Sequence, residues 1–127
     1  MSRPITRPIH AILDYVYATK AMAAPKVMKF TDEPKALIAS ESVGALTLLM
    51  GLFTKHEGGL VKALPFNTHL KMDAVAGLLT LGAPWMFGFA HNRRARNAFI
   101  ALAAISFAVV ALSEPDNGSM FEESDDA

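Results

Sequence analysis

Two long stretches that are almost free of charge constrain the fold of this chain most. Residues 36–54 contain Glu41 as their only charged side chain, and residues 97–113 contain none. A helix that crosses the apolar core of a bilayer needs about 20 residues, with a lower limit near 17. Neither stretch has a polar face that could meet water. Both are therefore predicted to be membrane-spanning helices.

Two further stretches, residues 8–28 and 69–90, are of similar length and carry polar residues near their starts. Pro8 and Pro34 are well placed to open helices, because proline is favoured in the first helical turn. Together with the two charge-poor stretches, they predict an all-α fold of four transmembrane helices.

The 127 residues allow one domain, which we place at residues 1–113. Residues 114–127 contain six acidic residues and no basic one, a composition typical of a disordered, solvated tail. Twelve basic residues balance twelve acidic residues, so the charge gives no indication of a nucleic-acid partner. The chain has no cysteine, which excludes disulfides and thiolate chemistry.

An internal repeat appears when the sequence is shifted by 59 positions. The matched pairs include His10 with His69, Asp14 with Asp73, and Pro25 with Pro84. These residue types are uncommon in apolar segments, so the matches predict two equivalent two-helix units, residues 8–54 and 67–113. An even number of crossings separates equivalent points. The repeats are therefore parallel, and the starts of the first and third helices converge at one surface.

Residues 83–89 read APWMFGF, and residues 24–26 read APK at the equivalent place. The first segment resembles the Ser-Pro-Trp signature of the SPW-repeat family of bacterial membrane proteins, with Ala83 in place of Ser. The second segment lacks both Ser and Trp. The starts of the first and third helices, HAILDY and HLKMD, are also similar to that family. The resemblance covers residues 8–113 and implies a four-helix fold in the bacterial inner (cytoplasmic) membrane, with no reaction attached.

His10 with Asp14, and His69 with Asp73, are spaced four residues apart, which puts each pair on one helix face. If the two faces meet, they form a four-ligand site for a divalent metal, because imidazole and carboxylate suit zinc, copper or iron. A proton relay is a second possibility. A haem b held by both histidines is a third. A purely structural His–Asp network is the simplest interpretation.

Glu57 follows His56 in the connection between the second and third helices, at the same predicted surface as the two histidines. It is placed to add a ligand to the metal site. The simpler interpretation is a solvated loop.

A stripe of small residues marks the second helix and comprises Ser40, Gly44, Thr47 and Gly51. Small residues at this spacing let helices approach closely in lipid. The stripe motivates our first functional hypothesis, a structural or accessory membrane protein that forms a homo-oligomer or joins a larger complex. The second hypothesis is a metal-binding, haem-binding or proton-relay protein. An enzyme is disfavoured, because no phosphate-binding loop, nucleophile elbow or metalloprotease motif occurs.

Lys20 and Glu41 are charges that the second repeat replaces with Leu79 and Ile100. Both lie roughly 9–12 Å from the loop that joins their helices, counted at 1.5 Å per residue. Isolated charges at such depth are expensive. The matched depths predict a buried ion pair, and the alternative is that Lys20 extends its ammonium to the headgroups.

Overall fold

The computed structural model describes residues 3–54 and 58–115. Four helices account for most of this part of the chain. They are α1 (Arg7–Val27), α2 (Pro34–Leu52), α3 (Phe66–Met86) and α4 (Arg93–Leu112). Within the described residues, extended pairing is limited to two isolated bridges, between Ile5 and Ser113 and between Thr54 and Leu64. The prediction of an all-α fold with four helices is confirmed.

The ends of the helices follow from local sequence. Proline occupies the first turn of α1 and of α2, and the Asn92 side chain caps α4 by accepting a hydrogen bond from the Ala95 N–H. After α1 and α3 the chain turns through a residue with positive φ, Lys29 at 58° and Gly88 at 78°. Glycine adopts this conformation freely, whereas lysine does so at a cost.

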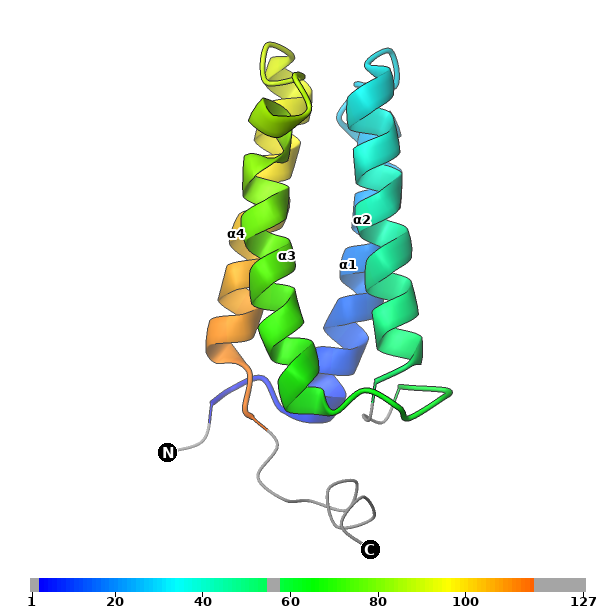
Figure 1. Ribbon diagram of the computed structural model, residues 1–127, viewed down its shortest axis with the longest axis vertical. Coiled ribbons are helices and arrows are strands. Elements are labelled where there is room, and N and C mark those ends of the chain that lie inside the picture. The colour runs from blue at the N-terminus through cyan, green and yellow to red at the C-terminus, as the bar shows by residue number, and fades with distance from the viewer. Residues whose placement is uncertain (1–2, 55–57, 116–127) are drawn as a thin grey trace, which may run out of the picture.

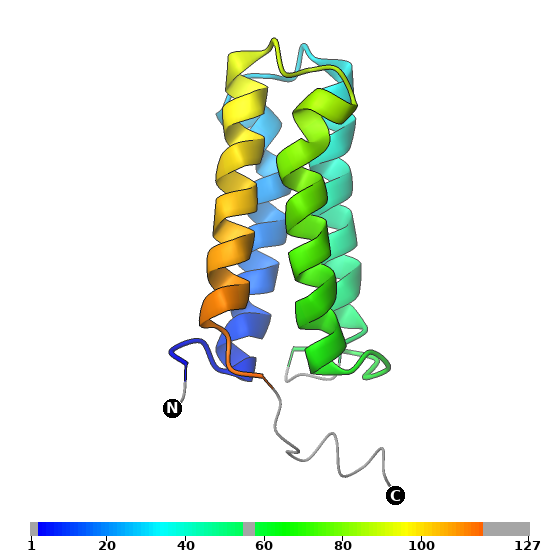
Figure 2. The same cartoon turned by 60° about the vertical axis from the view of Figure 1, so that its left-hand side comes forward.

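The helices form two antiparallel hairpins, α1 with α2 and α3 with α4, which stand side by side (Figures 1 and 2). The α1–α2 and α3–α4 loops lie at one end of the molecule, which we call the loop end. Both chain termini and the α2–α3 connection lie at the other end, the terminal end. The starts of α1 and α3 are therefore neighbours.

Local structure recurs at the 59-residue offset. α1 and α3 begin 59 positions apart and also end 59 positions apart. The Phe30 N–H donates to the Pro25 carbonyl at 2.9 Å, and the Phe89 N–H donates to the Pro84 carbonyl at 2.8 Å. The two hairpins thus share the bounds of their first helices and this turn hydrogen bond at the 59-residue offset.

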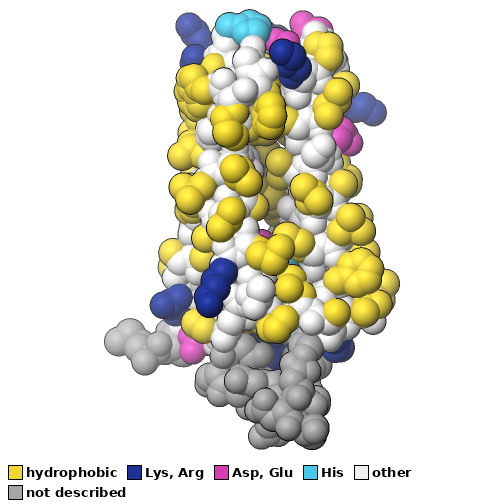
Figure 3. All heavy atoms as spheres, in the orientation of Figure 1, with side chains coloured by type: hydrophobic (Ala, Val, Ile, Leu, Met, Phe, Trp, Pro, Cys, Tyr) yellow, Lys and Arg dark blue, Asp and Glu magenta, His cyan; other side chains and the backbone are white. Residues whose placement is uncertain are grey.

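The interior of the bundle is filled mainly by small side chains, whereas large apolar side chains face outward. Alanines such as Ala21, Ala36 and Ala95 are fully buried, but Ile12 and Leu78 are more than half exposed. On the face in Figure 3, hydrophobic side chains cover the middle of the molecule, and most charged side chains lie toward its two ends. This distribution is opposite to that of a water-soluble bundle.

Two of the helices, α2 and α4, are long and apolar enough to cross a membrane. All four helices were expected to be transmembrane helices. By length and composition, this expectation is met by α2 and α4. In α1 and α3 the polar residues interrupt the apolar run. These are Arg7, His10, Asp14, Lys20 and Lys26 in α1, and His69, Lys71 and Asp73 in α3.

The small-residue stripe of α2 packs against α1. Ser40 donates a hydrogen bond to the Ala21 carbonyl at 2.5 Å. A Cβ on Gly44 would lie 2.8 Å from the Ala18 carbonyl oxygen, and one on Gly51 would lie 3.3 Å from the Tyr15 ring. The stripe therefore serves a contact within the chain, and it no longer argues for an oligomer.

Candidate metal centre

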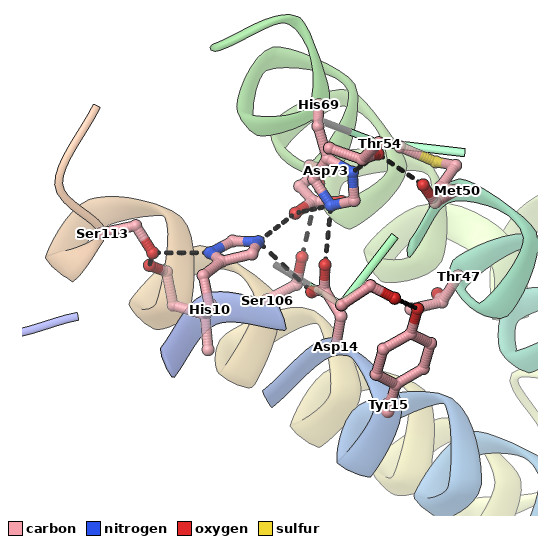
Figure 4. A network of polar contacts seen from close by, with 12 residues as sticks. His10, Asp14, Tyr15, Thr47, Met50, Thr54, His69, Asp73, Ser106 and Ser113 are labelled. Carbon is pink, nitrogen blue, oxygen red and sulfur yellow. Dashed lines mark hydrogen bonds and ion pairs between the residues drawn. The ribbon is translucent and has the colours of Figure 1, made fainter. Parts of the chain in front are cut away.

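The polar cluster at the terminal end consists of His10, Asp14, His69 and Asp73, which we call the His/Asp cluster (Figure 4). Each histidine lies in the first turn of its helix, α1 or α3, and each aspartate follows one turn later. Because α1 and α3 start side by side, the two faces meet in the bundle. One ligand atom from each residue lies within 4.8 Å of the other three. The predicted convergence of the four residues is therefore present in the structure.

Each histidine contacts both aspartates through its Nε2 atom. His10 Nε2 lies 3.3 Å from Asp14 Oδ1 and 3.1 Å from Asp73 Oδ2. His69 Nε2 lies 2.8 Å from Asp14 Oδ2 and 3.1 Å from Asp73 Oδ2. Asp14 thus uses one oxygen for each histidine, whereas Asp73 presents a single oxygen to both.

The cluster is withdrawn from solvent. Both histidine side chains are fully buried, and those of Asp14 and Asp73 are 8% and 16% exposed. Burying charged groups is costly unless they are paired. The four residues therefore depend on one another for their stability.

The outer nitrogens of the two rings are held by hydroxyl groups at the ends of the partner hairpins. His10 Nδ1 lies 2.7 Å from Ser113 Oγ, and His69 Nδ1 lies 2.6 Å from Thr54 Oγ1. Ser113 follows α4 and Thr54 follows α2. Each hairpin therefore supplies the hydroxyl that contacts the histidine of the other hairpin.

These hydroxyls fix the tautomer of both histidines. The Ser113 hydroxyl donates its hydrogen to the Val109 carbonyl, and the Thr54 hydroxyl donates to the Met50 carbonyl. A hydroxyl has one hydrogen, so each oxygen must accept from the ring that faces it. Both rings therefore carry a hydrogen on Nδ1, and Nε2 is the atom left to bind a cation.

The inner contacts require positive charge. In a neutral ring with hydrogen on Nδ1, Nε2 presents a lone pair, and here it faces carboxylate oxygens at 2.8–3.3 Å. Two lone pairs repel at such distances, unless a proton or a metal ion lies between them. Two protons or one divalent cation would each balance the two carboxylates.

Phe66 closes the cluster toward the terminal end. Its ring lies edge-on to His10 with 5.1 Å between centroids, and is nearly parallel to His69 at 6.3 Å. The two imidazoles are 5.3 Å apart at 84°. Since Asp14 and Asp73 contact both Nε2 atoms, no slot remains between the rings for a porphyrin. The geometry gives no support to the haem hypothesis.

A cavity of about 160 Å³ borders the cluster further along α1 and α3. Asp14 and Asp73 form its wall nearest the cluster. Other polar residues in the lining are Tyr17, Thr47, Thr80 and Ser106, and the remainder is apolar. The cavity therefore lies directly against the two carboxylates of the cluster.

Sequence reasoning missed the two hydroxyls and Phe66. Thr54 and Ser113 are 59 positions apart, the same offset that relates the two histidines, so the alignment contained the signal. The residue 59 positions before Phe66 is Arg7, so the match between the two halves of the sequence does not extend to this position. No sequence pattern marked Phe66 as a cover of the cluster.

Two other expectations have different outcomes. Glu57 lies outside the described residues. Lys20 and Glu41 are both exposed, and in the part of the chain that the structure describes no ion pair joins them. The expected buried ion pair is not formed, because the buried residues of α1 recur at a helical spacing that leaves Lys20 on the outer face.

Comparison with known proteins identifies the family. The family model described as SPW repeat domain matches residues 6–114, which include both hairpins and all four members of the His/Asp cluster. No curated protein and no solved structure gave a significant match. The match covers well over half of the chain and agrees with the resemblance at residues 83–89. The chain belongs to the SPW repeat domain family.

Proposed function

We propose that this protein is an integral membrane protein that binds a divalent transition metal ion at His10, Asp14, His69 and Asp73. One observation carries the proposal. Two imidazole Nε2 atoms and two carboxylates converge in a buried site, while both Nδ1 atoms are already bonded to hydroxyl oxygens. Such outer contacts orient the histidine ligands of metal sites.

The spacing of the ligand atoms suits zinc. Zinc binds histidine nitrogen and carboxylate oxygen at about 2.0–2.2 Å, so tetrahedral geometry separates neighbouring ligand atoms by roughly 3.3 Å. The four N···O distances are 2.8, 3.1, 3.1 and 3.3 Å. A small expansion of the cluster would therefore accommodate the ion. Its charge of two would neutralise both carboxylates.

A network that holds two protons is the second candidate, because two imidazolium rings would satisfy the same contacts. In that case the cluster ties the two hairpins together, and the protein has an accessory or proton-relay role. The net charge of the cluster favours neither candidate, because two protons and one divalent cation each make the cluster neutral. Metal binding makes the more specific prediction, because it requires one ion bound to all four residues.

The membrane location is supported by the surface of the bundle. Large apolar residues lie on the outside of all four helices, and α2 and α4 are long enough to cross a bilayer. In lipid, burial of small residues and exposure of large apolar ones is the expected pattern. We assign the chain to a bacterial inner membrane, with the bilayer as its main partner.

The orientation is proposed from the distribution of basic residues. Five belong to the segments that begin α1, join α2 to α3 and begin α3, and six lie near the loop end, namely Lys26, Lys29, Lys35, Arg93, Arg94 and Arg96. Cytoplasmic segments are enriched in lysine and arginine. We therefore place the loop end in the cytoplasm and the His/Asp cluster near the opposite surface.

The test is a zinc titration of the purified protein in detergent, followed by elemental analysis. We expect one zinc ion per chain in the wild type, and loss of binding in the double variant His10→Gln/His69→Gln. His91→Gln is the matched control, because His91 is exposed at the loop end, far along the helices from the cluster. Circular dichroism shows whether each variant is folded. Absence of zinc from the folded wild type would contradict the proposal and favour the proton-holding network.

A further inference from the structure

A second feature of the molecule, separate from the His/Asp cluster, is a groove between α2 and α3. Its volume is about 620 Å³, and most of its lining is apolar. Leu46 and Phe87 are among the apolar residues, and Lys35 is the one charged residue in the lining. The groove thus combines a long apolar surface with a single positive charge.

The length of the groove corresponds to one leaflet of a bilayer. It extends along α2 from Lys35 near the loop end to Leu46. Eleven residues at 1.5 Å each give roughly 16 Å. Half of a hydrocarbon core about 30 Å thick is roughly 15 Å. An acyl chain of one leaflet therefore matches the groove from end to end.

Lys35 lies at the mouth of the groove. Its Nζ is 4.0 Å from the position that a Cβ on Gly88 would take, so the side chain reaches from α2 toward the α3–α4 loop. No ion pair involves Lys35 within the described residues, and no carboxylate lines the groove. Nearby, Glu33 is paired with His91 at 2.9 Å. The charge at the mouth is therefore available to an anion.

We propose that the groove binds one acyl chain of an anionic membrane phospholipid, with the headgroup phosphate at Lys35. The inference rests on the membrane location proposed above and is independent of metal binding. The apolar lining selects an acyl chain, and the unpaired lysine selects a negative headgroup over a zwitterionic one. Basic side chains near a membrane surface attract anionic lipids in this way.

The experiment uses bromine-labelled lipids, which quench a nearby indole. Trp85 is the only tryptophan of the chain, and Phe87 lines the groove. The double change Trp85→Phe/Phe87→Trp moves the indole into the groove. The variant is reconstituted into vesicles containing brominated phosphatidylglycerol or brominated phosphatidylcholine. Flotation of the vesicles checks the membrane location separately.

We expect phosphatidylglycerol to be preferred about five-fold in quenching, the factor that corresponds to one lysine near an anionic surface. Lys35→Gln should remove the preference, and Lys29→Gln, an exposed lysine of the same loop end, should retain it. Ser42→Leu fills the groove and should reduce quenching by both lipids.

Equal quenching by the two lipids, or equal effects of the two lysine variants, would overturn the proposal. Quenching that persists after Ser42→Leu would also overturn it. Failure to float with the vesicles would instead contradict the membrane location.

Discussion

At the scale of single residues, the hydroxyls of Thr54 and Ser113 orient the two histidines that we propose as metal ligands. Each hydroxyl gives its hydrogen to a carbonyl of the preceding turn and accepts from a histidine Nδ1. A ring held in this way keeps its hydrogen on Nδ1, so the Nε2 lone pair faces the carboxylates. The two hydroxyls therefore hold the histidines in the orientation that the proposed metal binding requires.

Removal of one hydroxyl should weaken zinc binding while leaving all four ligands in place. We expect Thr54→Val to raise the zinc dissociation constant by about 10–100-fold, the usual effect of losing a group that orients a ligand. Competition with a chromophoric chelator measures the constant. The matched control is Thr19→Val, whose hydroxyl also bonds to a carbonyl four residues earlier but is exposed and far from any histidine. Equal effects of the two variants would show that Thr54 has no orienting role.

Zinc binding should also depend on pH. A metal ion replaces the protons that otherwise lie between Nε2 and the carboxylates, so binding releases protons. Affinity should therefore fall as the pH is lowered, because protons then compete with the metal ion for the two Nε2 atoms. Calorimetry in buffers of different ionisation enthalpy counts the released protons. A count of zero would contradict the assignment of the ion to the two Nε2 atoms.

At the scale of elements, α1 and α2 are in close contact through glycine. A Cβ on Gly44 would lie 2.5 Å from Met22 Cγ and 2.8 Å from the Ala18 carbonyl oxygen. Met22 is flexible at that point, but the backbone of α1 is not. Helices α1 and α2 must therefore move apart to accommodate any larger residue at position 44.

Gly44→Ala should destabilise the protein by about 1–3 kcal/mol, as overpacking does in other interiors. Gly82→Ala on α3 is the control, because a Cβ there meets no atom closer than 3.6 Å. It should be neutral or stabilising by up to about 1 kcal/mol, since alanine favours the helix. Thermal unfolding in detergent compares the two. Equal unfolding temperatures of Gly44→Ala and Gly82→Ala would contradict the close contact between α1 and α2 at Gly44.

Most of this element structure could be predicted from the sequence. Apolar length and the positions of proline predicted the four helices, and the match of His10 and Asp14 to His69 and Asp73 predicted where they meet. Helix depth predicted a buried ion pair between Lys20 and Glu41, which the structure does not form. Depth fixes position along the axis, whereas pairing also requires the right side of each helix. The buried residues Ala18 and Ala21 mark that side of α1, and Lys20 lies off it.

At the scale of the whole molecule, the two hairpins are joined at the terminal end by the His/Asp cluster. Each hairpin provides a His–Asp pair and a hydroxyl for the other. The α2–α3 groove lies between the hairpins nearer the loop end. At that end buried apolar residues of both hairpins, among them Phe30 and Phe99, also belong to one cluster.

The arrangement predicts that the two ends face opposite sides of the membrane. The chain has no cysteine, so single cysteines can be introduced without background. Lys62→Cys in the α2–α3 connection and His91→Cys in the α3–α4 loop are both exposed. We expect an impermeant thiol reagent to label the first in intact cells and the second only after lysis. Labelling of both from outside would contradict two membrane-crossing hairpins.

The central claim is that the His/Asp cluster is a metal site built from both hairpins. X-ray absorption at the zinc edge tests it most directly in the zinc-loaded protein. We predict two nitrogen and two oxygen neighbours at about 2.0–2.2 Å, with the outer-ring scattering that identifies imidazole. The double variant Asp14→Asn/Asp73→Asn should lose this signature while remaining folded by circular dichroism. A zinc environment without imidazole, or one unchanged in that variant, would contradict the claim.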